Sequence, residues 1–161
     1  MEEEQPTTPN NQRPPDRQGP SGLFPVPANP LFKRGDDLLD AGLRLVTLTN
    51  SAPAAVQQQL ANAGLMPFFE RSFSVDAVRR FKPAAEAYRS VANSLGLPVD
   101  RLRLVAAHAW DIVGALRAGC AAAFVARPGK VLYPLGPKPD ITGPDFRSVA
   151  NQIVASEARA A

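Results

Sequence analysis

The amino-acid sequence predicts an α/β domain built on a parallel β-sheet. From Lys33 onward, apolar runs of strand length alternate with segments of helical periodicity. This order is typical of right-handed strand-helix-strand crossovers. The apolar runs are continuous, as expected of strands that are covered on both faces. Glycines and prolines fall between the segments, where helices begin and end.

The first half of this pattern contains two predicted strands and three predicted helices. The segment GDDLLDAG ends a short helix at Gly42, and the run LRLVTLT that follows is a strand. Ser51 and Pro53 open a helix that Gly64 closes. RSFSV is a short strand. PAAEAYRSVANSLG is a helix with its apolar side chains on one face and Gly96 at its end.

The second half repeats the alternation. LRLVAAH is a strand, the residues from Asp111 to Gly119 form a helix, and AAAFVA is the next strand. A loop rich in proline and glycine leads to DITG, a short last strand. DFRSVANQIVA is a final helix that turns Phe146, Val149 and Ile153 inward.

The start of the chain has a different composition. Residues 1–30 hold eight of the 17 prolines. Such a segment buries too little apolar surface to offset its ordering entropy. We therefore expect a disordered leader over residues 1–32, a domain over residues 33–156 and a tail over residues 157–161. The apolar part of the leader, GLFPVPANPLF, has too many prolines for a central strand.

Composition narrows the functional classes. The chain has 161 residues, of which 45% are hydrophobic, so one domain with a real core is expected. No signal peptide and no run of eighteen apolar residues is found, which predicts a cytoplasmic protein without a membrane span. The single cysteine and single histidine argue against a zinc site. Cys120 lies in an apolar segment and is expected to be a buried thiol.

Charge argues against nucleic-acid binding. The formal net charge is only +3. The basic residues form no stripe with interleaved aromatic side chains. They are scattered along the chain, at Arg44, Arg71, Arg79, Arg80, Lys82, Arg101 and Arg103.

Polar side chains follow three of the predicted strands, and in a parallel sheet such strand ends share the edge where ligands bind. Thr49, Asn50 and Ser51 lie between a strand and a helix, where they either cap the helix or hold an anion. Lys82 precedes Pro83 at a helix start, where the helix dipole disfavours a cation. It is either a surface lysine or one that points into the site to hold a carboxylate.

The third cluster consists of His108, Trp110 and Asp111. Aspartate is a preferred helix cap, which explains Asp111 alone. It does not explain the neighbouring tryptophan, which we expect in a loop at the rim of the site, with the histidine nearby. The cluster favours a ligand wall beside a carboxylate. Three such clusters in order at one end of a sheet indicate a binding site.

Several segments together resemble the haloacid dehalogenase superfamily, and more narrowly the type II (S)-2-haloacid dehalogenases. They are VTLTNS, RFKPAAEAY, VAAHAWDIVGALRAG and AAFVARPG, and the likeness runs from about Leu38 to Val154. The resemblance implies a Rossmann-like core and a hydrolase that converts 2-haloacids to 2-hydroxy acids without a cofactor. In this family an aspartate after the first strand attacks the carbon that bears the halogen, and water hydrolyses the aspartyl ester.

The resemblance also implies roles for the three clusters. Thr49 would bind the substrate carboxylate, and Asn50 and Trp110 would cradle the leaving halide. Lys82 would hold the nucleophile ionised, because a nearby cation favours the charged carboxylate. Asp111 would orient or activate the hydrolytic water. Tyr88 is implied to support this network. His108 is also expected to support it, although His108, Ala106 and Ala107 depart from the family pattern, in which many relatives carry Ser and Asn.

The sequence departs from the family pattern at its beginning. The apolar strand followed by Asp-x-x-Gly-Thr, which carries the nucleophile, is not found, and neither is the helical cap that follows it. Asp16 has no strand before it, and Asp36 and Asp37 begin a helix. We therefore expect an incomplete core that is inactive alone. Its implied partners are a small 2-haloalkanoic acid and either a second copy, in a homo-oligomer, or a complementing N-terminal half.

The family's first strand lies between the strands that end here at Asn50 and His108. Without it, two apolar strand edges lack a partner and either invite association or close onto each other. Two other functions stay open. One is a non-catalytic anion-binding or interaction remnant. The other is a Mg²⁺-dependent phosphatase of the superfamily, which would place a paired carboxylate near Asp111, where His108 and Trp110 stand.

Overall fold

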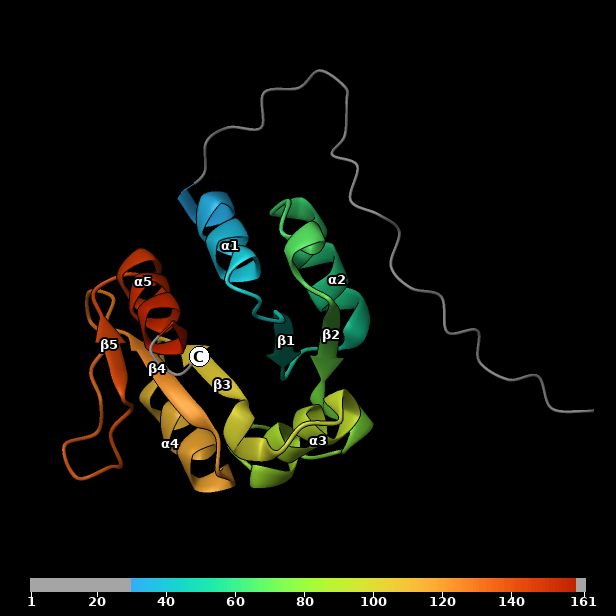
Figure 1. Cartoon of the computed structure of the whole chain (residues 1–161). Helices are drawn as coiled ribbons and strands as arrows, with labels where there is room; N and C mark the ends of the chain where they lie inside the picture. Colours follow the sequence, from blue (N-terminus) through green and yellow to red (C-terminus); the bar gives the residue numbers. More distant parts are fainter. Residues whose placement is uncertain (1–29, 159–161) are drawn as a thin grey trace, which may run out of the picture.

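The computed structural model describes residues 30–158, with side chains from residue 35 onward. Helices and strands alternate along this part of the chain as the sequence predicts (Figure 1). The helices are α1 (Pro30–Asp40), α2 (Pro53–Asn62), α3 (Ala85–Leu95), α4 (Ala109–Ala118) and α5 (Phe146–Glu157). The strands are β1 (Val46–Thr49), β2 (Arg71–Ser74), β3 (Arg103–Ala106), β4 (Ala121–Val125) and β5 (Ile141–Gly143).

The strands form two parallel sheets, which confirms the predicted α/β architecture. β1 pairs with β2, with Val46 opposite Arg71. β3, β4 and β5 form the second sheet in that order, with Arg103 opposite Ala121. In the described part of the chain, β1 and β3 are not paired with each other. The two strand edges that lack a partner have therefore not closed onto each other.

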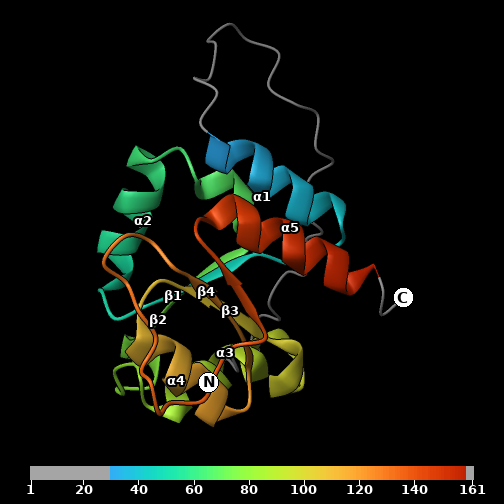
Figure 2. The ribbon, with the colours of Figure 1, turned by 90° about the vertical axis from the view of Figure 1, so that its left-hand side faces the viewer.

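Helices cover both faces of the three-stranded sheet, as continuous apolar strands require (Figure 2). Alternate side chains of β4 point to opposite faces. Ala123 and Val125 belong to the core cluster that includes α5 residues. Ala122 and Phe124 pack with Ile112 of α4 on the other face. Helix α1 lies beside α5, and α3 lies beside α4.

The beginning of α4 differs from the prediction that Asp111 opens and caps this helix. The helix begins at Ala109, and His108 is the N-cap residue. The His108 carbonyl accepts hydrogen bonds from the backbone N–H groups of Asp111 and Ile112, at 3.1 and 3.2 Å. Asp111 therefore lies inside the first turn, and Trp110 lies in the helix rather than in a loop. The aspartate side chain is used elsewhere, as described below.

Two predicted boundaries fall near the limits of the described region. Helix α1 begins at Pro30, inside the predicted leader of residues 1–32. Residues 1–29 and 159–161 lie outside the described residues, so the leader and the tail stay predictions. Within residues 30–158, none of the helices combines the length and apolarity that a membrane crossing requires.

Cys120 precedes β4 in a core cluster with Tyr88, Ala115 and Ala118. Its exposed fraction is 4%, which confirms the predicted burial. Burial raises the pKa of the Cys120 thiol to about 11. The folded chain therefore favours the neutral thiol at physiological pH.

We expect this thiol to make the fold less stable at alkaline pH. The ordinary pKa of 9.0 applies to the unfolded chain, whereas the folded chain holds the proton up to about 11. The contribution is fully present below the unfolded pKa and is lost as the pH rises through the folded one. The free energy of unfolding, from urea titrations across this window, should fall less steeply for Cys120→Ala than for the original chain. Equal slopes would contradict the prediction.

Candidate active site

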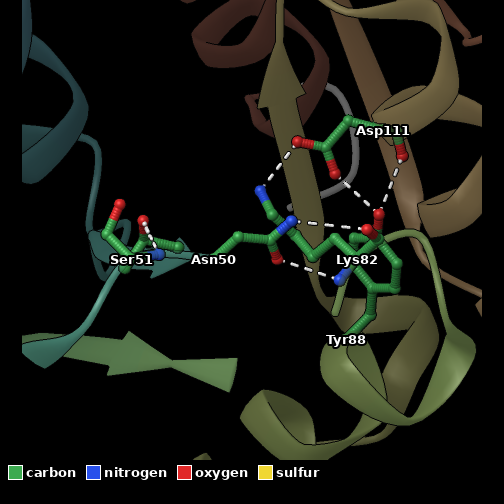
Figure 3. A network of polar contacts seen from close by, with 6 residues as sticks. Asn50, Ser51, Lys82, Tyr88 and Asp111 are labelled. Carbon is green, nitrogen blue, oxygen red and sulfur yellow. Dashed lines mark hydrogen bonds and ion pairs between the residues drawn. The ribbon is translucent and has the colours of Figure 1, made fainter. Parts of the chain in front are cut away.

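The candidate site lies on the segments that follow β1, β2 and β3 (Figure 3). Asn50 directly follows β1, and Lys82 lies in the loop before α3. Tyr88 lies in α3, and Asp111 lies in the first turn of α4. Four separate segments thus contribute to one polar cluster.

The Asp111 carboxylate is at the centre of this cluster. Lys82 Nζ donates to Oδ2 at 2.8 Å, and Tyr88 Oη donates to Oδ1 at 2.6 Å. The Lys82 and Asp111 side chains are only 10% and 7% exposed. A carboxylate this buried is stable only when charges and hydrogen bonds replace water. Both oxygens have such a partner, and the N-terminal end of α4 also favours negative charge.

Tyr88 is a permanent donor in this cluster. It is 1% exposed. Burial, and then its hydrogen bond to Asp111, raise the pKa of Tyr88 far above its usual range, so the phenol stays protonated. Gly114 in α4 makes room for it, because a Cβ there would lie 2.6 Å from Tyr88 Oη and 2.6 Å from Pro83 Cβ.

Asn50 holds the backbone of Lys82. Its Oδ1 accepts from the Lys82 N–H at 2.9 Å, and its Nδ2 donates to the Lys82 carbonyl at 3.4 Å. The Lys82–Pro83 peptide bond is cis. The predicted helix-capping role is wrong for Asn50, because the N-cap of α2 is Ala52 and no side chain caps that helix. Asn50 instead ties the end of β1 to the lysine.

Thr49 lies next to Asn50, and the hydrogen bond of its side chain is to the Ser51 backbone rather than to Lys82, Tyr88 or Asp111. Its Oγ1 accepts a hydrogen bond from the Ser51 N–H at 3.0 Å. The hydroxyl is partly buried at the carboxyl end of β1. The local contact orients the oxygen and leaves its proton available for a further bond.

Aromatic side chains lie against the lysine. Lys82 Nζ is 5.7 Å from the ring centroid of Trp110, within the range of a cation–π contact. The His108 ring lies 5.8 Å from the Trp110 ring, tilted by 35°. Lys130 Nζ lies 3.5 Å from His108 Nε2. The Lys82 ammonium therefore contacts both a carboxylate and an aromatic ring from the first turn of α4.

The structure brings together six of the predicted site residues: Asn50, Lys82, Tyr88, His108, Trp110 and Asp111. Sequence reasoning missed Gly114 and Lys130. A glycine inside a helical pattern is a signal that could have found the first. Among residues 30–158, no three His, Cys, Asp or Glu side chains gather closely enough to hold a metal ion.

Comparison with known proteins identifies the family. The model of the haloacid dehalogenase-like hydrolases matches residues 28–119, more than half of the chain. The chain belongs to this family.

The relatives of this haloacid dehalogenase-like chain are named (S)-2-haloacid dehalogenases, which is a more specific activity than the family's. The chain is 30% identical over 124 residues to the (S)-2-haloacid dehalogenase of Pseudomonas sp. (strain YL), and the match covers 77% of this chain and 53% of that enzyme. It is 39% identical over 87 residues to the (S)-2-haloacid dehalogenase of Xanthobacter autotrophicus, covering 54% of this chain and 34% of that enzyme. The chain thus spans about half the length of the first of these relatives.

Solved structures agree with the sequence comparison. The L-2-haloacid dehalogenase of Xanthobacter autotrophicus with covalently bound chloropropionic acid matches with a TM-score of 0.69 and 27% identity, over 75% of this chain and 58% of that one. Another L-2-haloacid dehalogenase matches with a TM-score of 0.72 and 30% identity, over 82% of this chain and 56% of that one. The predicted partial core of the haloacid dehalogenase fold is confirmed.

The buried ion pair should be strongly coupled. Lys82→Met leaves the Asp111 carboxylate without its cation, and Asp111→Asn leaves the ammonium without its anion. Each change should cost about 3 kcal/mol in the free energy of unfolding, because a lone buried charge remains. The double variant should lose clearly less than the sum, which urea unfolding of all four proteins would measure.

Arg103 and Asp140 offer the matched control for this cycle. Their ion pair has a distance of 2.7 Å, but the Asp140 side chain is 54% exposed. Arg103→Met and Asp140→Asn should show a coupling below about 1 kcal/mol. Similar coupling in the two cycles would contradict the claim that burial makes the Lys82–Asp111 pair special.

Gly114→Ala should destabilise the fold even though alanine favours helices. The helix propensity gain is about 1 kcal/mol. The new Cβ would push on Tyr88 and Pro83, and overpacking costs about 1–3 kcal/mol. Thermal unfolding should show a lower midpoint, and the loss should shrink in a Tyr88→Phe background, where the nearest oxygen is gone. An unchanged loss in that background would place the strain elsewhere.

Proposed function

We propose that this chain supplies part of the active site of an enzyme that hydrolyses small (S)-2-haloalkanoic acids to 2-hydroxy acids through an aspartyl ester. The observation that carries the proposal is the buried cluster of Lys82, Tyr88 and Asp111 beside Trp110, in a chain of the haloacid dehalogenase-like family. The relatives named (S)-2-haloacid dehalogenases support this substrate class.

Lys82 is the cation that would serve the nucleophile. Its ammonium has three N–H donors, and Asp111 uses one of them. A nucleophilic aspartate placed beside it would be held ionised, because the nearby positive charge lowers the free energy of the carboxylate. The Asn50 contacts to the Lys82 backbone would keep the ammonium in place during the attack on the carbon that bears the halogen.

Three residues would bind the substrate. Thr49 Oγ1 accepts from the Ser51 N–H and would donate its own proton to the substrate carboxylate. Asn50 has a second N–H beyond the one directed at the Lys82 carbonyl. That N–H and the indole N–H of Trp110 would stabilise the departing halide. His108, whose ring is tilted by 35° relative to that of Trp110, would support the orientation of the indole.

Asp111 would act in the second step. A carboxylate accepts about four hydrogen bonds, and Lys82 and Tyr88 supply two. A remaining lone pair would take a proton from the water that attacks the carbonyl carbon of the aspartyl ester. The bond between that carbonyl carbon and the substrate oxygen then breaks, and the leaving oxygen takes up the proton held by Asp111. The 2-hydroxy acid is released, and the nucleophile is left as a carboxylic acid that loses its proton to solvent. Tyr88 would keep the Asp111 carboxylate oriented throughout.

The nucleophile would have to come from another segment. In the described residues, the ion partner of Lys82 is Asp111, which the proposal uses for hydrolysis. We therefore propose that the 161-residue chain is inactive alone and that an N-terminal half of a homologous enzyme completes it.

The test is chloride release from (S)-2-chloropropionate without added metal. The chain alone should release no chloride above the buffer blank. A mixture with the N-terminal half of an (S)-2-haloacid dehalogenase should release chloride. Lys82→Ala and Asp111→Ala should each lower that rate by at least about a hundredfold, as the loss of an acid–base or charge-stabilising group does.

Arg117→Ala is the matched control, since Arg117 is exposed on α4 and lies outside the site. It should leave the rate of the mixture unchanged. An active mixture that is insensitive to the Lys82 and Asp111 changes would show that the assigned roles are wrong. Turnover by the chain alone would overturn the proposed inactivity and turn attention to Asp36 and Asp37. Mg²⁺-dependent release of phosphate from a phosphate monoester, without chloride release from (S)-2-chloropropionate, would favour the phosphatase instead.

A further inference from the structure

A β-turn brings a further basic side chain to the edge of the sheet that carries the site. Strand β4 ends at Val125, beside the end of β3 (Figure 1). The turn that follows is Arg127-Pro128-Gly129-Lys130, in which the Lys130 N–H donates to the Arg127 carbonyl at 2.9 Å. Proline in the second position and a glycine with a φ of 77° in the third are typical of a type II turn. The sequence therefore determines where Lys130 leaves the strand.

The loop beyond the turn packs against α4. Leu132 packs against the core cluster that includes Ile112 of α4 and Phe124 of β4. At Gly136, an added Cβ would lie 3.2 Å from Val113 Cγ2, so the loop backbone runs close to the helix. Both contacts hold the loop on the helix whose first turn carries the tryptophan and the aspartate of the site. The lysine of the turn is thereby kept near that first turn.

Lys130 reaches the site through a histidine. Its Nζ atom lies 3.5 Å from His108 Nε2. The His108 ring lies 5.8 Å from the Trp110 ring, and Lys82 Nζ lies 5.7 Å from the centroid of the same Trp110 ring. A continuous row of side chains thus connects the two ammonium groups across the tryptophan.

The two ammonium groups differ in what balances their charge. Lys82 pairs with Asp111 at 2.8 Å. Among the side chains of residues 35–158, Lys130 forms no ion pair with a carboxylate, and its neighbour His108 is a second basic group. Both are exposed, so a dissolved ion can reach them. An anion that contacts both would balance the charge of the lysine and accept hydrogen bonds. The pair therefore points to an anionic group of a ligand.

The proposed function already gives the first carboxylate of the substrate another place. That carboxylate would bind at Thr49, and the halide would lie between Asn50 and Trp110. An anion held by His108 and Lys130, on the far side of the tryptophan row from Lys82, is therefore a different group. A 2-haloacid that fills both places carries a second carboxylate at the end of its side chain.

We propose that the site takes 2-halodicarboxylic acids and that Lys130, together with His108, holds the distal carboxylate. The ammonium has three N–H donors and the imidazole accepts at most one, so donors remain for the carboxylate. The inference rests on the proposed function for the reaction at the carbon that bears the halogen. The distal carboxylate does not react, so the products are halide and a 2-hydroxydicarboxylic acid.

The chain contains its own probes for this contact. His108 is the only histidine and Trp110 the only tryptophan among the 161 residues. The full chain is titrated at constant pH with 2-chlorosuccinate and with its β-amide, which has nearly the same shape but no distal charge. The dicarboxylate should shift the imidazole NMR signals and change the tryptophan fluorescence. Its Kd should be about fivefold lower than that of the amide, which is the upper range for one exposed ion pair.

Substitutions on the loop test whether the preference comes from Lys130. Lys130→Met should make the two ligands bind equally, and Lys130→Arg should keep the preference, because the positive charge is retained. Lys138→Met is the matched control. It removes the same charge from the same loop, but Lys138 Nζ donates to the Tyr133 and Pro134 carbonyls. The preference for the dicarboxylate should survive this change.

Equal affinity of the two ligands for the original chain would overturn the inference, and that comparison needs no variant. So would the absence of any change in both probes. A preference that survives Lys130→Met, or that is lost to the same extent in Lys138→Met, would show a general attraction of anions and would overturn it as well.

Chloride release separates this inference from the proposed function. In the mixture with the N-terminal half, kcat/KM should be higher for (S)-2-chlorosuccinate than for (S)-2-chloropropionate. Lys130→Met should lower kcat/KM for the dicarboxylate about fivefold. Turnover without any preference for the dicarboxylate would overturn the inference and leave the proposed function standing. A mixture that releases no chloride from either acid would contradict the proposed function, and the binding titrations would then decide alone whether Lys130 holds a distal carboxylate.

Discussion

The buried carboxylate of Asp111 is the constraint on which the site depends. A charge with so little exposure needs a cation and a donor, and Lys82 and Tyr88 supply them. The lysine lies in a loop, so its own position has to be held, and Asn50 does this through the Lys82 backbone. One contact thus requires the next, from α4 back to the end of β1. The polar cluster therefore also joins the two sheets.

Local signals predicted most of the fold. The strands were found because their apolar runs are short, β-branched and bounded by turn residues, and the helix ends were found because glycines stand there. Gly96 and Gly119 adopt positive φ angles of 68° and 101° at those ends, where other residues are strained. The predicted start of α4 was wrong because aspartate is a preferred N-cap residue, which made Asp111 look like the first residue of the helix. Asp111 is instead the third residue of the helix, where its side chain pairs with Lys82.

The site was predictable in its members but not in its contacts. Shared strand ends bring Asn50, Lys82 and Asp111 to one edge, which topology alone implies. No local sequence pattern shows that Lys82 pairs with Asp111, 29 positions away. Nor does one show that Asn50 forms hydrogen bonds with the Lys82 backbone instead of capping a helix. These contacts depend on how α3 packs on α4. That packing in turn requires glycine at position 114, because a side chain there would collide with Tyr88 and Pro83.

The division into two sheets has a consequence for how the molecule opens. The sheets share no hydrogen-bond ladder in the described structure. A two-stranded sheet is marginal by itself, so β1 and β2 rely on neighbouring helices such as α2. Local unfolding of this pair therefore costs less free energy than global unfolding, whereas the three-stranded sheet with its two helical layers opens last. Asn50 follows β1 directly, so opening of this pair releases the Lys82 backbone and exposes the buried Lys82–Asp111 ion pair to water.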